Sequence, residues 1–271
     1  MPDPSPPPLD LTAYWNDRYS TIDSTRSGHI DLPASYNAWL YRRKQDQVRR
    51  AIAKVGASLK GRRLLEIAAG SGAWMAFWEA QGVSGYLGVD LSERAVKGLR
   101  TSFPHHEFLQ RDLTDLHIGE AVGTGYDFVS AIDVLYHLVD DHQFAQVLVD
   151  LSSVLKPGGL LLIHDQFLRG PAQDYGGYIR WRSRAEFVAA LDAAGFEVLY
   201  RHPTFFFMVQ ATDFTGRPAR VMHLLWNQFQ RPAIGRAPTV AGAIGYLVDT
   251  AICSMLREGP AFNVMVCRKR H

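Results

Sequence analysis

The sequence between residues 64 and 73 reads Leu64-Leu65-Glu66-Ile67-Ala68-Ala69-Gly70-Ser71-Gly72-Ala73. Its first half is an apolar run of strand length that holds one acid, and its second half consists of small residues. Small residues directly after a strand favour a tight turn into a helix, where a ligand can approach the backbone and its exposed N–H groups. The stretch therefore predicts a strand, a ligand-binding turn and the start of a helix.

From residue 62 onward, apolar runs of strand length alternate with helical patterns. This alternation is typical of βαβ units and predicts an α/β fold with a parallel sheet. We expect strands at residues 63–68, 85–90, 106–110, 126–133, 159–165, 196–200 and 262–268. We expect helices at residues 36–57, 72–81, 92–102, 141–155, 183–194, 219–229 and 240–256. Ser183, with Glu186 three residues later, predicts a capping box at one of these helices.

The chain has 271 residues, a formal net charge of +2, 47% hydrophobic residues and 21% charged residues. This composition excludes a wholly disordered protein, and the length suits one large domain with an insertion. Prolines crowd the first eight residues and predict a disordered leader over residues 1–13. A helical lid is expected over residues 14–60. Residues 61–271 are expected to form the main domain, with an insertion at about 205–258 that covers the substrate.

Cys253 and Cys267 are too few for a disulfide framework and lack the paired spacing of a zinc site. The N-terminus lacks a signal-peptide pattern, and Asp249 interrupts the longest apolar segment near the C-terminus. We therefore expect a cytoplasmic protein without a membrane span. Residues 61–199 are acidic in total, whereas residues 200–271 are basic. Two interpretations of this asymmetry are open. The charged faces contact only solvent, or the middle segment binds a cationic ligand and the tail binds an anionic partner.

Asp90 ends the second expected strand, about twenty residues after the glycine turn. A carboxylate at that place accepts hydrogen bonds from ribose hydroxyls, so the turn and the acid together indicate a nucleoside ligand. A dinucleotide fold would have a third glycine where this sequence has Met75, which disfavours a nicotinamide-dependent oxidoreductase.

Five motifs in this order resemble those of class I S-adenosylmethionine-dependent methyltransferases. They are Glu66-Ile67-Ala68-Ala69-Gly70-Ser71-Gly72, Val89-Asp90-Leu91-Ser92, Arg111-Asp112-Leu113, Tyr126-Asp127-Phe128-Val129 and Leu155-Lys156-Pro157-Gly158-Gly159. The resemblance implies S-adenosyl-L-methionine as the cofactor and S-adenosyl-L-homocysteine as its product. It also implies a doubly wound, Rossmann-like sheet of seven strands in the order 3-2-1-4-5-7-6, with the last strand antiparallel.

The resemblance also assigns residues to the cofactor. The expected cofactor-binding residues are Tyr14, Trp15, Tyr19, Glu66, Ala68, Gly70, Gly72, Asp90, Leu91, Asp112, Leu113, Ile132 and Asp133. In this set, Asp90 would hold the ribose hydroxyls, and Asp112 with Leu113 would face the adenine. Glu66, the glycine turn and the end of the fourth strand would face the methionine part. The three N-terminal aromatic residues resemble an element that often closes over the cofactor, and Ala68 stands where the family usually has glycine.

Methyl transfer from a sulfonium is an in-line displacement that depends mainly on the alignment of the reactants. A base is needed when the acceptor carries a proton of high pKa, and histidine suits neutral pH. His137 follows the fourth expected strand and His164 ends the fifth, so both are candidate bases at the ligand crevice. No metal is expected, because Asp165-Gln166 stands where the related metal-dependent enzymes have Asp-Asn.

Several classes of acceptor are disfavoured. Asp133-Val134-Leu135-Tyr136 lacks the two prolines found in methyltransferases of nucleic-acid amines, and both cysteines lie far from the place of a cytosine-attacking nucleophile. No basic run with interleaved aromatic residues is present, so no nucleic-acid partner is expected. Aromatic residues and arginines of the insertion predict a small-molecule pocket, with a homodimer surface or a structural lid as alternatives. We expect methylation of a small metabolite at oxygen or nitrogen, as in natural-product biosynthesis; a SAM-binding protein that acts on RNA or protein is the alternative.

Overall fold

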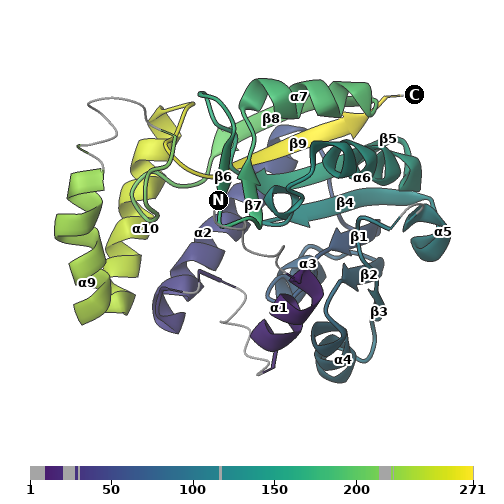
Figure 1. The fold of residues 1–271 in the computed structure, drawn as a ribbon, viewed down its shortest axis with the longest axis horizontal. Coiled ribbons are helices and arrows are strands. Elements are labelled where there is room, and N and C mark those ends of the chain that lie inside the picture. Colours follow the sequence, from purple (N-terminus) through teal and green to yellow (C-terminus); the bar gives the residue numbers. More distant parts are fainter. Residues whose placement is uncertain are drawn as a thin grey trace, which may run out of the picture.

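The computed structural model describes residues 10–20, 28–29, 31–115, 118–213, 221 and 223–270. Its centre is a seven-stranded sheet in the order β3-β2-β1-β4-β5-β9-β8 (Figure 1). The strands are β1 (Arg63–Ile67), β2 (Gly85–Asp90), β3 (Glu107–Gln110), β4 (Tyr126–Ile132), β5 (Leu155–Asp165), β8 (Phe196–Pro203) and β9 (Asn263–Lys269). The first five are parallel, and β9 runs antiparallel to both β5 and β8. The predicted order is confirmed, since β8 and β9 are the sixth and seventh strands of this sheet.

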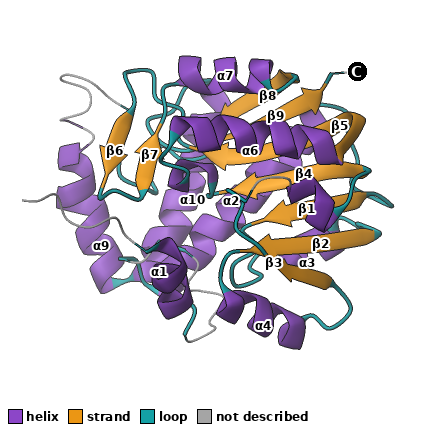
Figure 2. Cartoon of the chain, turned by 45° about the vertical axis from the view of Figure 1, so that its right-hand side comes forward, coloured by secondary structure: helices purple, strands orange, loops and turns teal. Residues whose placement is uncertain are grey.

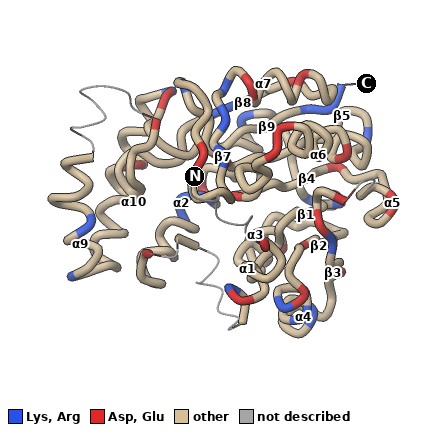
Figure 3. The backbone as a smooth tube through the Cα atoms, in the orientation of Figure 1, with Lys and Arg blue, Asp and Glu red and all other residues tan. Residues whose placement is uncertain are grey.

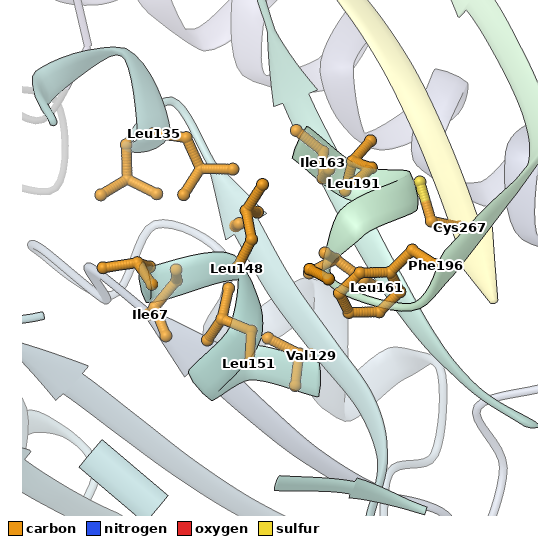
Figure 4. Close-up of a cluster of buried hydrophobic side chains, with 14 of the residues drawn as sticks. Ile67, Val129, Leu135, Leu148, Leu151, Leu161, Ile163, Leu191, Phe196 and Cys267 are labelled. Carbon is orange, nitrogen blue, oxygen red and sulfur yellow. The ribbon is translucent and has the colours of Figure 1, made fainter. Parts of the chain in front are cut away.

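Helices cover both faces of the sheet (Figure 2). They include α2 (Ala34–Lys54), α3 (Met75–Ala80), α4 (Glu93–Ser102), α5 (Ile118–Val122), α6 (Asp141–Val154) and α7 (Arg184–Ala193). Successive residues of β5 belong to different buried clusters: Leu161 and Ile163 to one, Leu160 and Leu162 to the other. This alternation is the pleat of a strand that is buried on both faces. The first cluster joins α6 and α7 to the sheet (Figure 4), and the second joins α2 and α3.

Polar side chains determine where several helices begin. The hydroxyl of Ser183 accepts the backbone N–H of Glu186, and the carboxylate of Glu186 accepts the backbone N–H of Ser183 at 2.9 Å. The predicted capping box is thus confirmed. Ser92 likewise caps α4 by accepting the backbone N–H of Ala95. These side chains satisfy N–H groups that the first turn of a helix leaves without partners.

The first helix begins earlier than expected. Asp10 accepts the backbone N–H of Ala13 at 2.9 Å, which starts α1 (Leu11–Arg18). The predicted leader over residues 1–13 is therefore wrong at its C-terminal end, because an N-cap precedes Leu11. Residues 1–9 lie outside the described part of the chain.

A two-stranded hairpin, β6 (Gln173–Tyr175) and β7 (Ile179–Trp181), follows β5 and was not predicted. Gly176 and Gly177 form its turn, with φ angles of 59° and 73°. Consecutive residues with positive φ match the twist of a hairpin. Strands of three residues are too short to show an alternating pattern in the sequence, so only the glycine pair signalled this hairpin.

The helical insertion lies between β8 and β9 in the sequence, and Figure 1 shows it at the opposite end of the molecule from β3. It contains the π-helical turn η2 (Trp226–Gln230), α9 (Arg231–Arg236) and α10 (Pro238–Met255). Of the helix predicted at 219–229, residues 221 and 223–225 are helical and continue into η2, whereas 219, 220 and 222 are not described. The predicted helix at 240–256 is α10, which begins two residues earlier.

The insertion packs on the N-terminal half of α2 through a third buried cluster that includes Tyr36, Phe205 and Trp226. A Cβ atom on Gly242 of α10 would lie 2.3 Å from the Trp39 ring, so only glycine allows this approach. Among the described residues, α10 is the one helix long and apolar enough to cross a membrane by length and composition. Here it lies against α2 as part of the fold.

Candidate active site

A cavity of about 610 Å³ opens at the carboxyl ends of β1, β2 and β4. Side chains of α1, α2, the hairpin and the segment after β8 also line it. Ligands of open α/β sheets bind at this place, where the strand order reverses between β1 and β4. Eleven of the thirteen predicted cofactor residues line the cavity. They are Tyr14, Trp15, Tyr19, Ala68, Gly70, Asp90, Leu91, Asp112, Leu113, Ile132 and Asp133.

β1 and β4 end in the same unusual way. Ala68 has a φ of 55° and Asp133 a φ of 56°, and no other described non-glycine residue has a positive φ. β1 and β4 therefore end one residue before the predicted strands at 63–68 and 126–133, because a residue in the left-handed conformation cannot continue a strand. Ala68 occupies this conformation where glycine would be free of strain, at a cost of about 1–2 kcal/mol. Both residues turn the chain at the cavity wall.

The two glycines of the β1 turn serve different purposes. Gly70, with a φ of 58°, lines the cavity, and a Cβ atom there would lie 2.9 Å from the hydroxyl of Tyr19. Gly72 is not among the lining residues. A Cβ atom at Gly72 would lie 2.6 Å from the Phe103 ring and 2.8 Å from Leu99. Gly72 thus lets the turn pack closely on α4, and its contact with the cofactor stays a prediction.

Asp90 connects the ends of β1 and β2. One carboxylate oxygen accepts the backbone N–H of Gly70 at 2.8 Å, and the other accepts that of Ser92 at 2.9 Å. Burial raises the pKa of Asp90 to about 6, although both N–H groups lower it. Because a carboxylate oxygen accepts two hydrogen bonds, each oxygen retains one acceptor site. Two adjacent hydroxyl groups, as on a ribose, fit these sites.

Asp112 and Leu113 line the cavity beyond Asp90. One oxygen of Asp112 accepts both the backbone N–H and the hydroxyl of Thr114, each at 2.8 Å. This local turn fixes the side chain and leaves the second carboxylate oxygen without a described hydrogen bond. The pair thus presents one polar acceptor beside an apolar side chain, as an exocyclic amine on an aromatic ring requires.

Glu66 is buried beneath the turn after β1. Its side chain is 2% exposed and accepts hydrogen bonds from the Tyr86 hydroxyl at 2.5 Å and the Trp78 indole N–H at 3.1 Å. Glu66 does not line the cavity. Burial raises its pKa to about 8, although both hydrogen bonds lower it. The acid is a buried, hydrogen-bonded group beneath the turn, and its contact with the cofactor stays a prediction.

The N-terminal aromatic residues form one wall. Trp15 stacks on Tyr19 with ring centroids 6.0 Å apart, and the guanidinium of Arg18 lies 5.3 Å from the Trp15 ring. Asn16 attaches α1 to the start of α4 through the Ser92 hydroxyl at 2.8 Å. An aromatic wall of this kind can hold a cationic sulfonium. The same wall places Arg18 at the cavity, where a carboxylate can pair with it.

Asp133 is held by two partners that are distant in the sequence. One oxygen accepts from His164 Nδ1 at 2.5 Å, and the other pairs with the ammonium of Lys44 on α2. Burial alone would raise the pKa of Asp133, but Lys44 and His164 hold it well below its usual range. Asp133 is therefore ionised. Sequence reasoning missed Lys44, a cavity-lining residue whose partner lies on another element.

The two candidate bases differ in access. His164 is fully buried, stacks on Phe262 at 5.5 Å and does not line the cavity. His137 lines the cavity, and its Nδ1 lies 2.9 Å from the carbonyl oxygen of Tyr178. Because a carbonyl only accepts, Nδ1 carries the proton and Nε2 is left as an acceptor. Burial lowers the pKa of His137, so its ring is neutral at pH 7.

Other side chains at the cavity lie outside the predicted cofactor and base residues; of these, Phe205 belongs to the insertion that was expected to form a pocket. His29 lines the cavity but is exposed, and Tyr136, Tyr178 and Phe205 form aromatic walls. Asp165, weighed as a metal ligand with Asp133, is fully buried, and burial raises its pKa well above its usual value. The residues that the structure describes include no cluster of three side chains suited to a metal ion.

A family model for a methyltransferase domain matches residues 36–201. No match was found among curated proteins. The N-methyltransferase NodS of Bradyrhizobium japonicum WM9, solved with S-adenosyl-L-homocysteine, superimposes with a TM-score of 0.58 and 14% identity over 97% of this chain and 100% of that chain. Magnesium protoporphyrin IX methyltransferase (ChlM) of Synechocystis PCC 6803, solved with bound SAM, gives 0.55 and 15% over 98% and 100%.

The [4+2]-cyclase SpnF gives a TM-score of 0.52 and 17% identity over 83% of this chain and 80% of that chain. At such identities, structural likeness shows the fold alone. The family match covers more than half of the chain. The protein is an enzyme that uses S-adenosylmethionine, and it belongs to the class I S-adenosylmethionine-dependent methyltransferases.

Proposed function

We propose that this enzyme methylates an oxygen or nitrogen atom of a small molecule, with His137 as the general base. The observation that carries the proposal is the orientation of the His137 ring. Its Nδ1 lies 2.9 Å from the Tyr178 carbonyl oxygen, which leaves Nε2 as an acceptor on a residue that lines the cavity. A neutral imidazole held in one tautomer is prepared to accept a proton.

The walls around His137 support a small, partly aromatic acceptor. Its ring lies 5.1 Å from Trp15, 4.4 Å from Tyr136 and 6.0 Å from Tyr178, and Phe205 belongs to the same cavity. A volume of about 610 Å³ lies within the range of small-molecule sites. A folded RNA or protein could present only a narrow group to this site. We therefore propose that the enzyme is cytoplasmic and that its acceptor is a small metabolite, such as an intermediate of natural-product biosynthesis.

S-adenosylmethionine supplies an electrophilic methyl group on a sulfonium. In the proposed reaction, the oxygen or nitrogen of the acceptor attacks the methyl carbon, and the electrons of the carbon–sulfur bond remain on the sulfur. The proton of the acceptor passes to Nε2 of His137. The Tyr178 carbonyl stabilises the imidazolium that forms, since Nδ1 keeps its hydrogen bond in both states.

Lys44, Asp133 and His164 act in this scheme as positioning residues. The ion pair with Lys44 and the hydrogen bond from His164 hold the Asp133 carboxylate at the end of β4 in its left-handed conformation. The ionised carboxylate can accept from the amino group of the cofactor's methionine part, as the family resemblance implies. His164 supports Asp133 from beneath and has no direct access to the acceptor.

A methyl-transfer screen tests the proposal. Purified enzyme is incubated with isotopically labelled cofactor and a metabolite extract, and products are identified by mass spectrometry. A labelled O-methyl or N-methyl metabolite, absent with His137→Ala, is the expected result. Label found only in RNA or protein would replace the proposed acceptor class with a macromolecule. A product formed at full rate by the variant would exclude His137 as the base.

A further inference from the structure

The outer face of α10 is apolar and exposed. Val240, Ile244, Leu247 and Met255 are 57%, 55%, 66% and 74% exposed. Their spacing places all four on one side of the helix, along about 22 Å at 1.5 Å per residue. Asp249 lies on the opposite, buried side. The described part of the chain therefore leaves this side of α10 exposed.

The exposure extends to the segment before α10. Val221, Leu224 and Phe229 are 55%, 56% and 64% exposed. Single exposed apolar side chains are ordinary, but this concentration within one insertion is characteristic of an interaction surface. Leu256, directly after α10, is also exposed, whereas Val188 on α7 belongs to the sheet domain.

The charges around this face are of one sign. Arg236 precedes α10, Arg257 follows it, and Arg231 begins α9; all three are exposed and without a described ion pair. Between residues 221 and 257, the one carboxylate in the sequence is that of the buried Asp249. Figure 3 accordingly shows blue but no red segments on α9.

The nearest acids in the chain are already paired. Glu258 accepts from Arg184 at 2.9 Å and from Arg201 at 2.5 Å. Asp46 on α2 pairs with Arg49 at 2.6 Å. The rim of the exposed face is therefore left with uncompensated positive charge.

This charge pattern distinguishes two candidate partners for the exposed face of α10, a second copy of the chain and a lipid surface. A second copy of the chain, packed face to face, would bring arginines at the ends of one α10 against arginines of the other, which repel each other. An anionic lipid surface accepts both parts of the pattern, because apolar side chains enter the acyl boundary while arginines pair with phosphates. We propose that the outer face of α10 docks this enzyme on anionic membranes.

The docked helix lies in the plane of the surface. The carboxylate of Asp249 accepts the backbone N–H groups of Phe207 at 2.6 Å and Met208 at 3.2 Å. A spanning orientation would break these bonds and place Asp249 within hydrocarbon, which is costly. It would also remove Gly242 from the Trp39 ring. Docking in the plane leaves the fold intact.

Vesicle flotation tests the proposal on the full chain. We compare vesicles of phosphatidylcholine alone with vesicles of equal parts phosphatidylcholine and phosphatidylglycerol. Wild type is expected to float with the anionic vesicles and to be released as salt is raised. Leu247→Glu is expected to lower partitioning about tenfold or more, because an apolar anchor becomes an anion. Arg236→Glu combined with Arg257→Glu is expected to abolish the preference for anionic lipid.

Val188→Glu on α7 is the matched control and is expected to float like wild type. Thermal melting and binding of S-adenosyl-L-homocysteine verify that each variant is folded. Absence of flotation in wild type would overturn the proposal, as would equal flotation of wild type and Leu247→Glu. Sedimentation decides the dimer: a wild-type dimer that Leu247→Glu converts to a monomer, without lipid binding by either, would assign this face to a second copy.

Discussion

Different interactions hold the two ends of the cavity, which we call the cofactor end (at β1, β2 and β3) and the acceptor end (at His137 and Asp133). At the end formed by β1, β2 and β3, backbone N–H groups and short local turns hold Asp90 and Asp112. At the other end, side chains from α1, α2, η1 (Leu135–His137) and the hairpin meet across the fold, as with Lys44 and Asp133. This difference predicts which substitutions lower turnover and which lower the affinity for the cofactor. Single side chains should control turnover at the second end, whereas the first end should tolerate more and lose mainly affinity.

The largest effect is expected for His137→Ala. Loss of a general base should lower turnover by about 10²–10⁴, while affinity for S-adenosyl-L-homocysteine changes little. Single-turnover kinetics and calorimetry measure the two quantities. His29→Ala is the control, since His29 also lines the cavity but is exposed. If the control loses as much turnover as His137→Ala, the base is misassigned.

Lys44→Met should destabilise the acceptor end by about 3 kcal/mol, because it leaves the Asp133 carboxylate without its cation. Urea unfolding measures the change. Since ion pairing holds the pKa of Asp133 well below its usual range, its contribution is complete above about pH 4 and is lost as pH falls further. Asp133→Asn combined with Lys44→Met should recover part of the loss. Additive losses in the double variant would contradict coupling of the pair.

Glu66 should make the stability of the cofactor end fall with pH between about pH 4 and pH 8. Its folded pKa of about 8 exceeds the unfolded value, so folding favours the protonated acid. Stability from this group is complete below about pH 4 and is lost progressively as pH rises from there to about 8. Glu66→Gln should flatten this part of the stability curve. Parallel curves for the two proteins would show that Glu66 is already ionised at neutral pH.

Asp90→Ala should weaken cofactor binding by about 1.5–3 kcal/mol, the range for lost hydrogen bonds to a charged group. Calorimetry with S-adenosyl-L-homocysteine gives the affinity, and turnover at saturating cofactor should fall much less. Asp112→Ala is a useful companion at the same end. An unchanged affinity in Asp90→Ala would remove the ribose assignment.

The smallest effect is expected at the backbone of the turn. Ala68→Gly relieves a left-handed alanine, and the greater freedom of glycine in the unfolded chain offsets part of the gain. We expect a net stabilisation of about 0.5 kcal/mol by thermal melting. A clear destabilisation would mean that the Ala68 methyl group packs favourably enough to outweigh its strain.

The sequence was most informative where contacts are local. The turn after β1, Asp90 and the capping box of α7 were predicted because short runs of residue types at fixed spacing identify them. Lys44 was missed because its partner Asp133 is 89 residues away on another element. The burial of Glu66 away from the cavity was signalled by the strand pattern. Strand alternation puts Glu66 on the face of Leu64, beneath α3, and not at the strand end.

The length of α2 has a mechanical consequence. Its first half packs in the cluster of the insertion through Tyr36 and Leu40, and its second half packs under the sheet through Val48 and Ile52. The 21 residues of α2, between Pro33 and Val55, include neither glycine nor proline, so this helix has no residue at which a kink is expected. Lys44 sits midway along it. A tilt of the insertion would therefore tilt α2 and displace the ion pair between Lys44 and Asp133 at the cavity. A gate that admits the acceptor is therefore expected in the loops beside α2.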